Sequence, residues 1–210
     1  LICAGIFQTF PLHQSAYATP PKGSIEFTYT HGATDSLLPN QYLGFSNIQL
    51  NGDFTIETWV KFTSFTLYQQ FLGQAVSGGW SLQMMPTQKL RLTGTYGDLW
   101  ATTIFTANKW YHIALVRSGT ATGNLQIYVN GVASVDVASR TTTNPYNGAF
   151  GDSTKINTVG AGTYAGSDRF HGSISNIRYS NSAIYTSNFT PSTSPLTAAA
   201  GTVLLLNTTN

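Results

Sequence analysis

The chain has 210 residues, a formal net charge of +2 at pH 7 and only 9% charged side chains, whereas ordinary soluble domains carry roughly a quarter. This length suits a single β-domain with a sizeable core. Nucleic-acid binding needs a concentrated basic surface, and no stretch gathers lysine or arginine, so a nucleic-acid partner is not expected. No apolar run reaches the roughly 20 residues of a membrane-spanning helix.

Hydroxyl and amide side chains supply the polarity that charged groups do not. The chain holds 30 threonines, 19 serines and 14 asparagines. Threonine and the aromatic residues favour strands, whereas asparagine, glycine and proline favour turns, and the helix formers glutamate and lysine are scarce. We therefore predict an all-β fold. An uncharged surface of this kind is typical of proteins that work outside cells.

The first 22 residues differ from the rest of the chain. Residues 1–18 are uncharged and rich in apolar side chains, and they end in the letters AYA, a small-x-small pattern of signal-peptidase sites. A proline-rich linker follows. We expect residues 1–22 to form an arm apart from a domain over 23–210, and both a leader remnant and an arm that contacts neighbouring chains fit this pattern. The single cysteine, Cys3, permits no disulfide within the chain.

Short strand-like runs, separated by turn residues about every ten positions, fill the remainder of the chain. This spacing is typical of a sandwich or barrel. Asn130-Gly131 lies between two alternating runs and predicts a two-residue hairpin turn. One short helical turn is expected around Ile184. The predicted strands cover residues 24–29, 53–62, 69–76, 80–85, 89–96, 99–105, 109–117, 124–137, 155–161, 171–181 and 202–206.

Two of these strands alternate in a way that identifies their faces. The first has Phe54, Ile56, Val60 and Phe62 on one face, and Glu57, Trp59 and Lys61 on the other. The second has Trp110, His112, Ala114 and Val116 on one face, and Tyr111, Ile113, Leu115 and Arg117 on the other. Because both faces of the second strand are mostly apolar, we predict a central strand covered on both sides. His112 is predicted to face the sandwich interior as a framework residue, bonded to a backbone carbonyl or a hydroxyl.

Four motifs in order carry a family resemblance. FTIETWVKF, NKWYHIALVRSG, LQIYVNGV and FHGSISNIRYSNSAIYTSNFTPST together resemble the laminin-G-like domains of the concanavalin A-like lectin/glucanase superfamily, over about residues 23–206. The resemblance implies a two-sheet antiparallel jelly-roll sandwich. It does not imply one activity, because this superfamily holds lectins, glycosidases, adhesion modules and structural domains. The last motif is similar to modules of phage and other virion structural proteins and of secreted microbial proteins.

Catalytic chemistry finds little support in the residues. Glycoside hydrolysis uses two carboxylates facing each other, and related glycosidases place them at alternate positions of one strand. Here that strand has one carboxylate, Glu57, with Trp59 and Lys61 at the alternate sites. We predict that Glu57 lies on the sheet surface, paired with Lys61. The sequence has no Gly-x-Ser-x-Gly elbow either, so we expect no catalytic residues and no enzyme.

Metal binding is the next candidate. Calcium requires six to eight oxygen ligands, and the resemblance implies that a calcium site would lie at a loop rim. Asp152, Asp168 and loop carbonyls could assemble one, whereas the alternative is that these aspartates only form turns by bonding nearby backbone. No cofactor is therefore expected, with Ca²⁺ as the open alternative. No His/Cys cluster indicates zinc.

Sugar binding without catalysis requires an aromatic platform and polar groups that bond hydroxyls. The loops over 140–152 and 160–169 are the least strand-like parts of the chain and the expected binding rim. The candidate ligand-binding residues, each of which could instead be a packing residue, are Trp80, Trp100, Tyr146, Asp152, Tyr164 and Asp168.

These observations support three functional hypotheses. The first is a non-catalytic structural or adhesion module displayed on an extracellular assembly, above all a virion head-decoration or tail-fibre protein. In this hypothesis residues 1–22 bind neighbouring chains in an oligomer and the loops are free to contact a glycan or receptor. The alternative is a secreted, carbohydrate-binding, lectin-like protein that recognises a cell-surface glycan. A glycoside hydrolase is the third.

Overall fold

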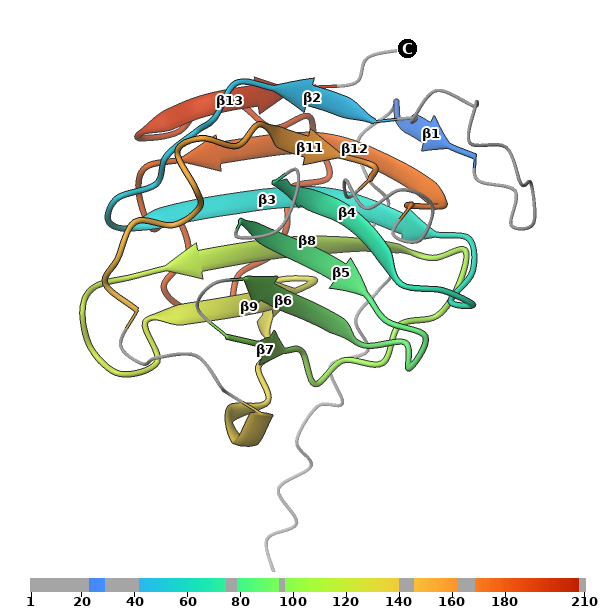
Figure 1. Ribbon diagram of the computed structural model, residues 1–210, viewed down its shortest axis with the longest axis horizontal. Helices are drawn as coiled ribbons and strands as arrows, with labels where there is room; N and C mark the ends of the chain where they lie inside the picture. The colour runs from blue at the N-terminus through green and yellow to red at the C-terminus, as the bar shows by residue number, and fades with distance from the viewer. Residues whose placement is uncertain are drawn as a thin grey trace, which may run out of the picture.

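The described residues of the computed structural model form two antiparallel β-sheets that pack face to face (Figure 1). These residues are 23–28, 42–74, 79–94, 97–139, 146–161 and 169–207. The predicted all-β jelly-roll sandwich is confirmed. The arm predicted over residues 1–22 lies outside the described residues.

Sheet A has the strand order β1-β12-β3-β8-β9-β10, and β13 also pairs with β12. Its strands are β1 (Ile25–Phe27), β3 (Phe54–Phe62), β8 (Trp110–Arg117), β9 (Leu125–Val129), β10 (Val132–Ala133), β12 (Gly172–Ser180) and β13 (Thr202–Leu206). As predicted, β8 is a central strand, paired with β3 on one side and β9 on the other.

Sheet B has the order β2-β11-β4-β5-β6-β7 and lies in front of sheet A in Figure 1. Its strands are β2 (Leu43–Phe45), β4 (Gln69–Gln74), β5 (Trp80–Met84), β6 (Leu90–Gly94), β7 (Leu99–Trp100) and β11 (Asn157–Val159). Strand β2 was not predicted, because three residues at a sheet edge give no readable alternation. The only helical element among the described residues is the short 3-10 helix Val137–Ser139, so no helix there could cross a membrane.

The main core lies between the two sheets and is rich in aromatic side chains. Phe62, the last residue of β3, contacts three other rings of this core, with the ring centroids of Phe71, Phe105 and Phe170 at 5.4, 5.9 and 5.5 Å. These three contacts are edge-on, the arrangement that aromatic pairs prefer. Because the described chain has no disulfide, this apolar contact area supplies most of the favourable folding free energy.

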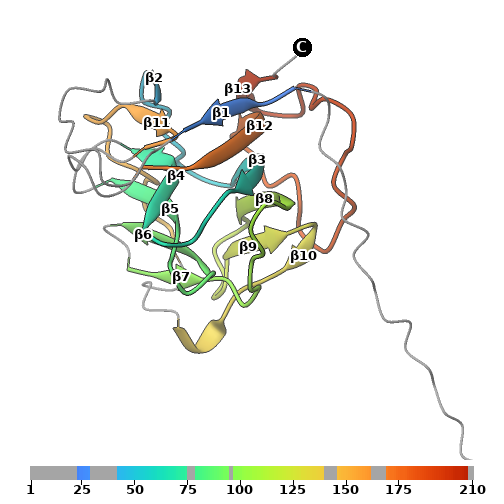
Figure 2. The ribbon, with the colours of Figure 1, turned by 90° about the vertical axis from the view of Figure 1, so that its right-hand side faces the viewer.

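The outer face of sheet A is also covered. Residues 181–201, which we call the covering segment, follow β12 and cross this face on the side away from sheet B (Figure 2). Thr55 anchors the segment, since its hydroxyl donates to the Ser182 carbonyl and accepts from the Ile184 amide, both at 2.9 Å. The helical turn predicted around Ile184 is wrong: this stretch is irregular, and side-chain bonds from sheet A satisfy its backbone groups instead.

The predicted Asn130-Gly131 hairpin turn is confirmed. Asn130 and Gly131 have φ values of 51° and 77°, as a two-residue primed turn requires, and Val132 pairs with Val129 across it. The turn also supports the covering segment, because the Gly131 carbonyl accepts a 2.9 Å bond from the Phe189 amide.

Substituting Gly131→Ala should therefore destabilise the fold more than Gly119→Ala does. Both glycines have positive φ, but a Cβ at Gly131 would overlap the Phe189 carbonyl, whereas a Cβ at Gly119 meets nothing within 4 Å. We expect losses in the free energy of unfolding of about 2 to 5 kcal/mol at Gly131 and about 1 to 2 kcal/mol at Gly119. Chemical denaturation measures both, and equal losses would contradict the contact between hairpin and covering segment.

Candidate functional site

A buried ionic cluster lies between sheet A and the covering segment, centred on Glu57. Its Oε1 accepts from both Nε and Nη2 of Arg178, the first bond measuring 2.8 Å. Its Oε2 accepts from His112 Nε2 at 3.0 Å and from the Tyr185 hydroxyl at 2.9 Å. The predicted surface position and Lys61 pairing of Glu57 are wrong, because the covering segment turns this face of sheet A into a second interior.

His112 belongs to the same cluster, and its predicted surroundings need correction. The residue is buried and structural in character, as expected, but it lies on the outer face of sheet A and not between the sheets. Its partner is the Glu57 carboxylate, not a carbonyl or hydroxyl. The His112 Nδ1 atom has no partner among the described residues, so the bond to Glu57 is the contact that orients the ring.

The contacts of Glu57 also fix its charge. Burial alone would raise the pKa of the Glu57 carboxyl, but the hydrogen bonds and charges of His112 and Arg178 outweigh burial and hold this pKa below its ordinary value of 4.5. The carboxylate is therefore ionised at neutral pH. Both of its oxygens are already bonded to protein groups, which leaves it no position from which to act on a ligand.

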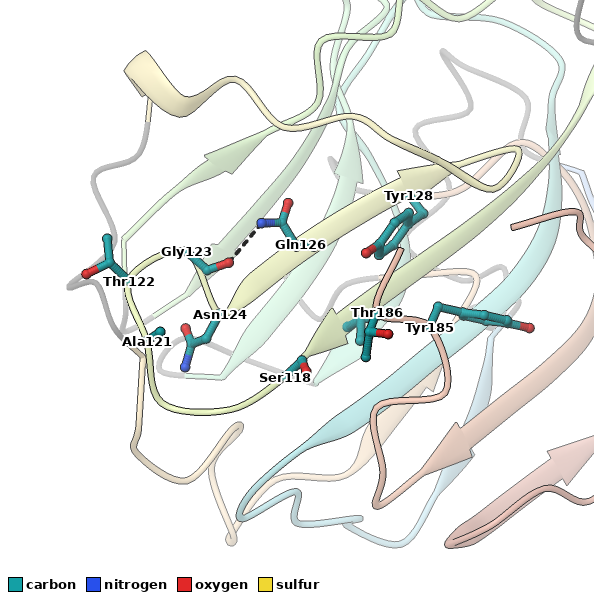
Figure 3. A pocket seen from close by; sticks show the side chains of 10 residues that line it. Ser118, Ala121, Thr122, Gly123, Asn124, Gln126, Tyr128, Tyr185 and Thr186 are labelled. Atoms are coloured by element: carbon teal, nitrogen blue, oxygen red, sulfur yellow. Dashed lines mark hydrogen bonds between the residues drawn. The ribbon is translucent and has the colours of Figure 1, made fainter. Parts of the chain in front are cut away.

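A hollow of about 240 Å³ opens beside this cluster on the outer face of sheet A (Figure 3). Val116 of β8 and Gln126 and Tyr128 of β9 line it from the sheet, where Val116 and Gln126 are paired in register. The β8–β9 loop over 118–124 forms one side, and the covering segment forms the other. None of the described lining residues is charged; the full set is Val116, Ser118, Ala121, Thr122, Gly123, Asn124, Gln126, Tyr128, Tyr185 and Thr186.

Hydrogen bonds within the protein hold the walls of the hollow in place. Asn124 donates to the Gly119 and Tyr146 carbonyls at 3.0 and 2.7 Å and accepts from the Tyr146 amide, which fixes the loop. Gln126 donates to the Gly123 carbonyl at 2.8 Å (Figure 3). Opposite them, the Tyr185 ring stacks on Phe189 with a centroid distance of 3.5 Å. The hollow is therefore preformed.

The aromatic residues predicted as sugar platforms lie elsewhere. Trp80 and Tyr146 are core residues with 3% and 5% exposure, and the slot that they line holds only about 10 Å³, so neither can stack on a sugar. Trp100 is half-buried on β7, where the Arg91 guanidinium lies 5.6 Å from its ring centroid. Tyr164 lies outside the described residues.

Of the two aspartates predicted as ligands, the structure describes Asp152. Asp152 forms a turn: its Oδ1 accepts from the Thr154 amide at 2.9 Å and hydroxyl at 2.7 Å, and these bonds lower the pKa of its carboxyl. Asp168 lies outside the described residues, so the calcium alternative stays untested. Within the described ranges, no three His, Cys, Asp or Glu side chains gather closely enough to hold a metal ion.

None of the hollow's lining residues was among the sequence candidates. A usable signal did exist, because Gln126 and Tyr128 alternate on β9 and pair with Val116 and Ala114, which share a face with His112. The other wall could not be predicted, because Tyr185 and Thr186 lie in an irregular segment. No repeating pattern of apolar residues in this segment indicates its path over sheet A.

Comparison with known proteins identifies the class. Residues 35–187 match the family described as the concanavalin A-like lectin/glucanases superfamily, and the chain belongs to it. No curated protein matches the sequence. The family resemblance expected from the four motifs is confirmed.

Solved structures show the same fold at low identity. A candidate carbohydrate-binding protein from Bacteroides ovatus superposes with a TM-score of 0.55 and 18% identity, over 79% of this chain and 48% of that one. The heptameric SAP-like pentraxin from Limulus polyphemus gives a TM-score of 0.53 and 16% identity, over 78% of this chain and 77% of that one. The chain thus spans about half the length of the Bacteroides protein.

The ionic cluster predicts a contrast between two substitutions. Glu57→Gln keeps the shape of the side chain but leaves the Arg178 charge buried without its counterion, so we expect a loss of about 3 to 5 kcal/mol in the free energy of unfolding. Asp98→Asn breaks the Arg91–Asp98 pair, whose side chains are 27% and 25% exposed, and should cost at most about 1 kcal/mol. Denaturant titration measures the free energy of unfolding of both variants. If Glu57→Gln lost as little as Asp98→Asn, water would have to reach Glu57.

The lowered pKa of Glu57 also predicts a pH dependence. The folded-state pKa lies below the unfolded value of 4.5, so the stabilisation by this carboxylate is present above that value and is lost as pH falls through the folded-state pKa. The stability difference between wild type and Glu57→Gln should therefore stay constant from neutral pH down to the unfolded value of 4.5 and shrink as the pH falls further. Unfolding free energies measured across this range test the point, and a difference that also stays constant below that value would rule out Glu57 as the titrating group.

Proposed function

We propose that this protein is a non-catalytic, carbohydrate-binding, lectin-like domain whose sugar site is the hollow beside Tyr128 and Tyr185. The observation that carries the proposal is the chemistry of the lining, which combines hydroxyls, amides and tyrosine rings without a charge. Neutral sugars present hydroxyl groups that exchange hydrogen bonds with such groups. The volume of about 240 Å³ lies just below the roughly 300–1,000 Å³ of pockets for drug-sized ligands, so it suits a single sugar residue.

Two features argue for binding without hydrolysis. A glycosidase needs two opposed carboxylates, and none of the described residues that line the hollow is acidic. Glu57, the carboxylate of the ionic cluster, is fully buried, and both of its oxygens already accept hydrogen bonds from protein groups. The lining of the hollow therefore supports sugar binding without hydrolysis.

The comparisons agree with this proposal at the level of the fold. The chain belongs to a lectin/glucanase superfamily, and one similar structure is described as a candidate carbohydrate-binding protein. We propose an extracellular location on the same basis, together with the low-charge, hydroxyl-rich surface. Display on a virion, with residues 1–22 bound to neighbouring chains, stays the alternative, since those residues lie outside the described part of the chain and the comparisons support a lectin-like fold.

Blocking the hollow tests the proposal. Thr186→Trp places an indole at its edge, whereas Thr190→Trp, the matched control, alters another exposed threonine of the covering segment that does not line the hollow. We expect wild type and Thr190→Trp to bind the same glycans, and Thr186→Trp to bind them at least about tenfold more weakly, with all three equally stable because surface changes cost about 0.5 kcal/mol or less. Glycan arrays run with and without calcium provide the measurement. A wild type that binds no glycan, or a Thr186→Trp variant that binds normally, would refute the proposal.

A further inference from the structure

Tyr128 occupies an unusual place in the hollow. It lies on β9, pairs in register with Ala114 on β8, and packs edge-on against Phe189 with the ring centroids 5.6 Å apart. Only 4% of the residue is exposed. Its ring is therefore fixed between the sheet and the covering segment, and its hydroxyl points toward the hollow (Figure 3).

The Tyr128 hydroxyl has no hydrogen-bond partner among the described residues, whereas other buried tyrosines use theirs within the protein. The Tyr111 hydroxyl accepts from the Thr106 amide at 2.9 Å, and the Tyr146 hydroxyl donates to the Ala149 carbonyl. Tyr179 is also unpartnered, but it is sealed in the core beside Trp80. The Tyr128 hydroxyl, in contrast to that of Tyr179, is not sealed from solvent but reaches the hollow, so its hydrogen-bonding positions are open to water and to a ligand hydroxyl that takes the place of that water.

We propose that Tyr128 is a specificity-determining residue, whose hydroxyl bonds one particular hydroxyl of a neutral sugar residue seated in the hollow. This inference rests on the proposed carbohydrate-binding function and adds the group that selects the ligand. A site built to bond a substrate hydroxyl strongly rejects the analogue that lacks it, because the site's own polar group is then left unpaired. Tyr128 meets this condition because its ring cannot turn toward another partner.

The rest of the lining sets the class of sugar. Burial raises the pKa of the Tyr128 hydroxyl, so it remains a neutral donor and acceptor at physiological pH. Gln126 precedes it by two residues on the same face of β9, and Ser118 and Thr186 add hydroxyls across the hollow. With no cation in the described lining, a sugar carboxylate would lose its hydration without gaining a counterion. The site therefore selects neutral sugars over uronic acids.

The test combines a change in the protein, Tyr128→Phe, with the removal of single hydroxyl groups from the sugar, so that the coupling between the two can be measured. The probes are the methyl glycosides of glucose, galactose, mannose, N-acetylglucosamine, fucose and xylose, their monodeoxy analogues, and methyl glucuronide and galacturonide, each titrated by NMR. For the best-bound neutral sugar we expect one deoxy analogue to bind wild type at least tenfold more weakly. Tyr128→Phe should bind the parent sugar with the same loss and should no longer distinguish it from that analogue. The matching uronide should bind wild type at least tenfold more weakly than the neutral sugar.

Controls separate this role from a structural one. Tyr42→Phe changes a 38% exposed tyrosine next to β2, away from the hollow, and should leave every affinity unchanged. A Tyr128→Phe variant that binds within twofold of wild type, or that loses affinity yet still rejects the same deoxy sugar, would overturn the inference while the carbohydrate-binding function stands. Tight binding of the uronide would also overturn it. If wild type binds none of the sugars, the proposed function fails as well.

Discussion

The buried carboxylate of Glu57 is the constraint on which the outer half of this domain depends. An ionised group taken out of water requires partners on all of its acceptor positions, and here the donors come from three different elements. Arg178 is supplied by β12, His112 by β8 and Tyr185 by the covering segment. Removing any one of these elements would leave a charge or a donor buried without a partner. The cluster therefore fixes both the register of β12, β3 and β8 and the position of the covering segment on them.

The position of the hollow follows from this constraint. Tyr185 reaches the Glu57 carboxylate with its hydroxyl, so its ring is fixed, and the stack on Phe189 continues that wall toward Tyr128. A sheet face that would otherwise be open to water thus acquires a rigid second layer, in which the hollow lies. Rigid walls matter for a small polar ligand, because ordering loops on binding would consume much of the modest free energy that hydrogen bonds provide. In the proposed function, the ionic cluster would affect a ligand only by positioning this wall.

Sequence reasoning located the strands and the hairpin well, because alternation and the Asn130-Gly131 pair are local signals. It failed where the structure depends on distant residues. The alternation of side chains shows that β8 has two faces, but it does not show which face meets the other sheet, so the sequence prediction for His112 names the wrong face. Arg178 lies 121 residues from Glu57, and its outward orientation depends on a bulge at Asn176, whose φ is 54°. Without that extra residue, the alternation that places Ile174 in the core would turn Arg178 inward as well.

The chemistry of the hollow bears on how such a domain would work. Each neutral hydrogen bond to a sugar replaces one to water and contributes only about 0.5–1.5 kcal/mol, and the recess admits about one sugar residue. A few such bonds give an affinity near the millimolar range, which corresponds to about −4 kcal/mol. Binding this weak becomes useful when several copies act on one surface, since linked sites gain avidity without new contacts. An uncharged hollow on a rigid sandwich would therefore suit repeated display: under the proposed function, the number of copies would set the strength of binding and Tyr128 the choice of sugar.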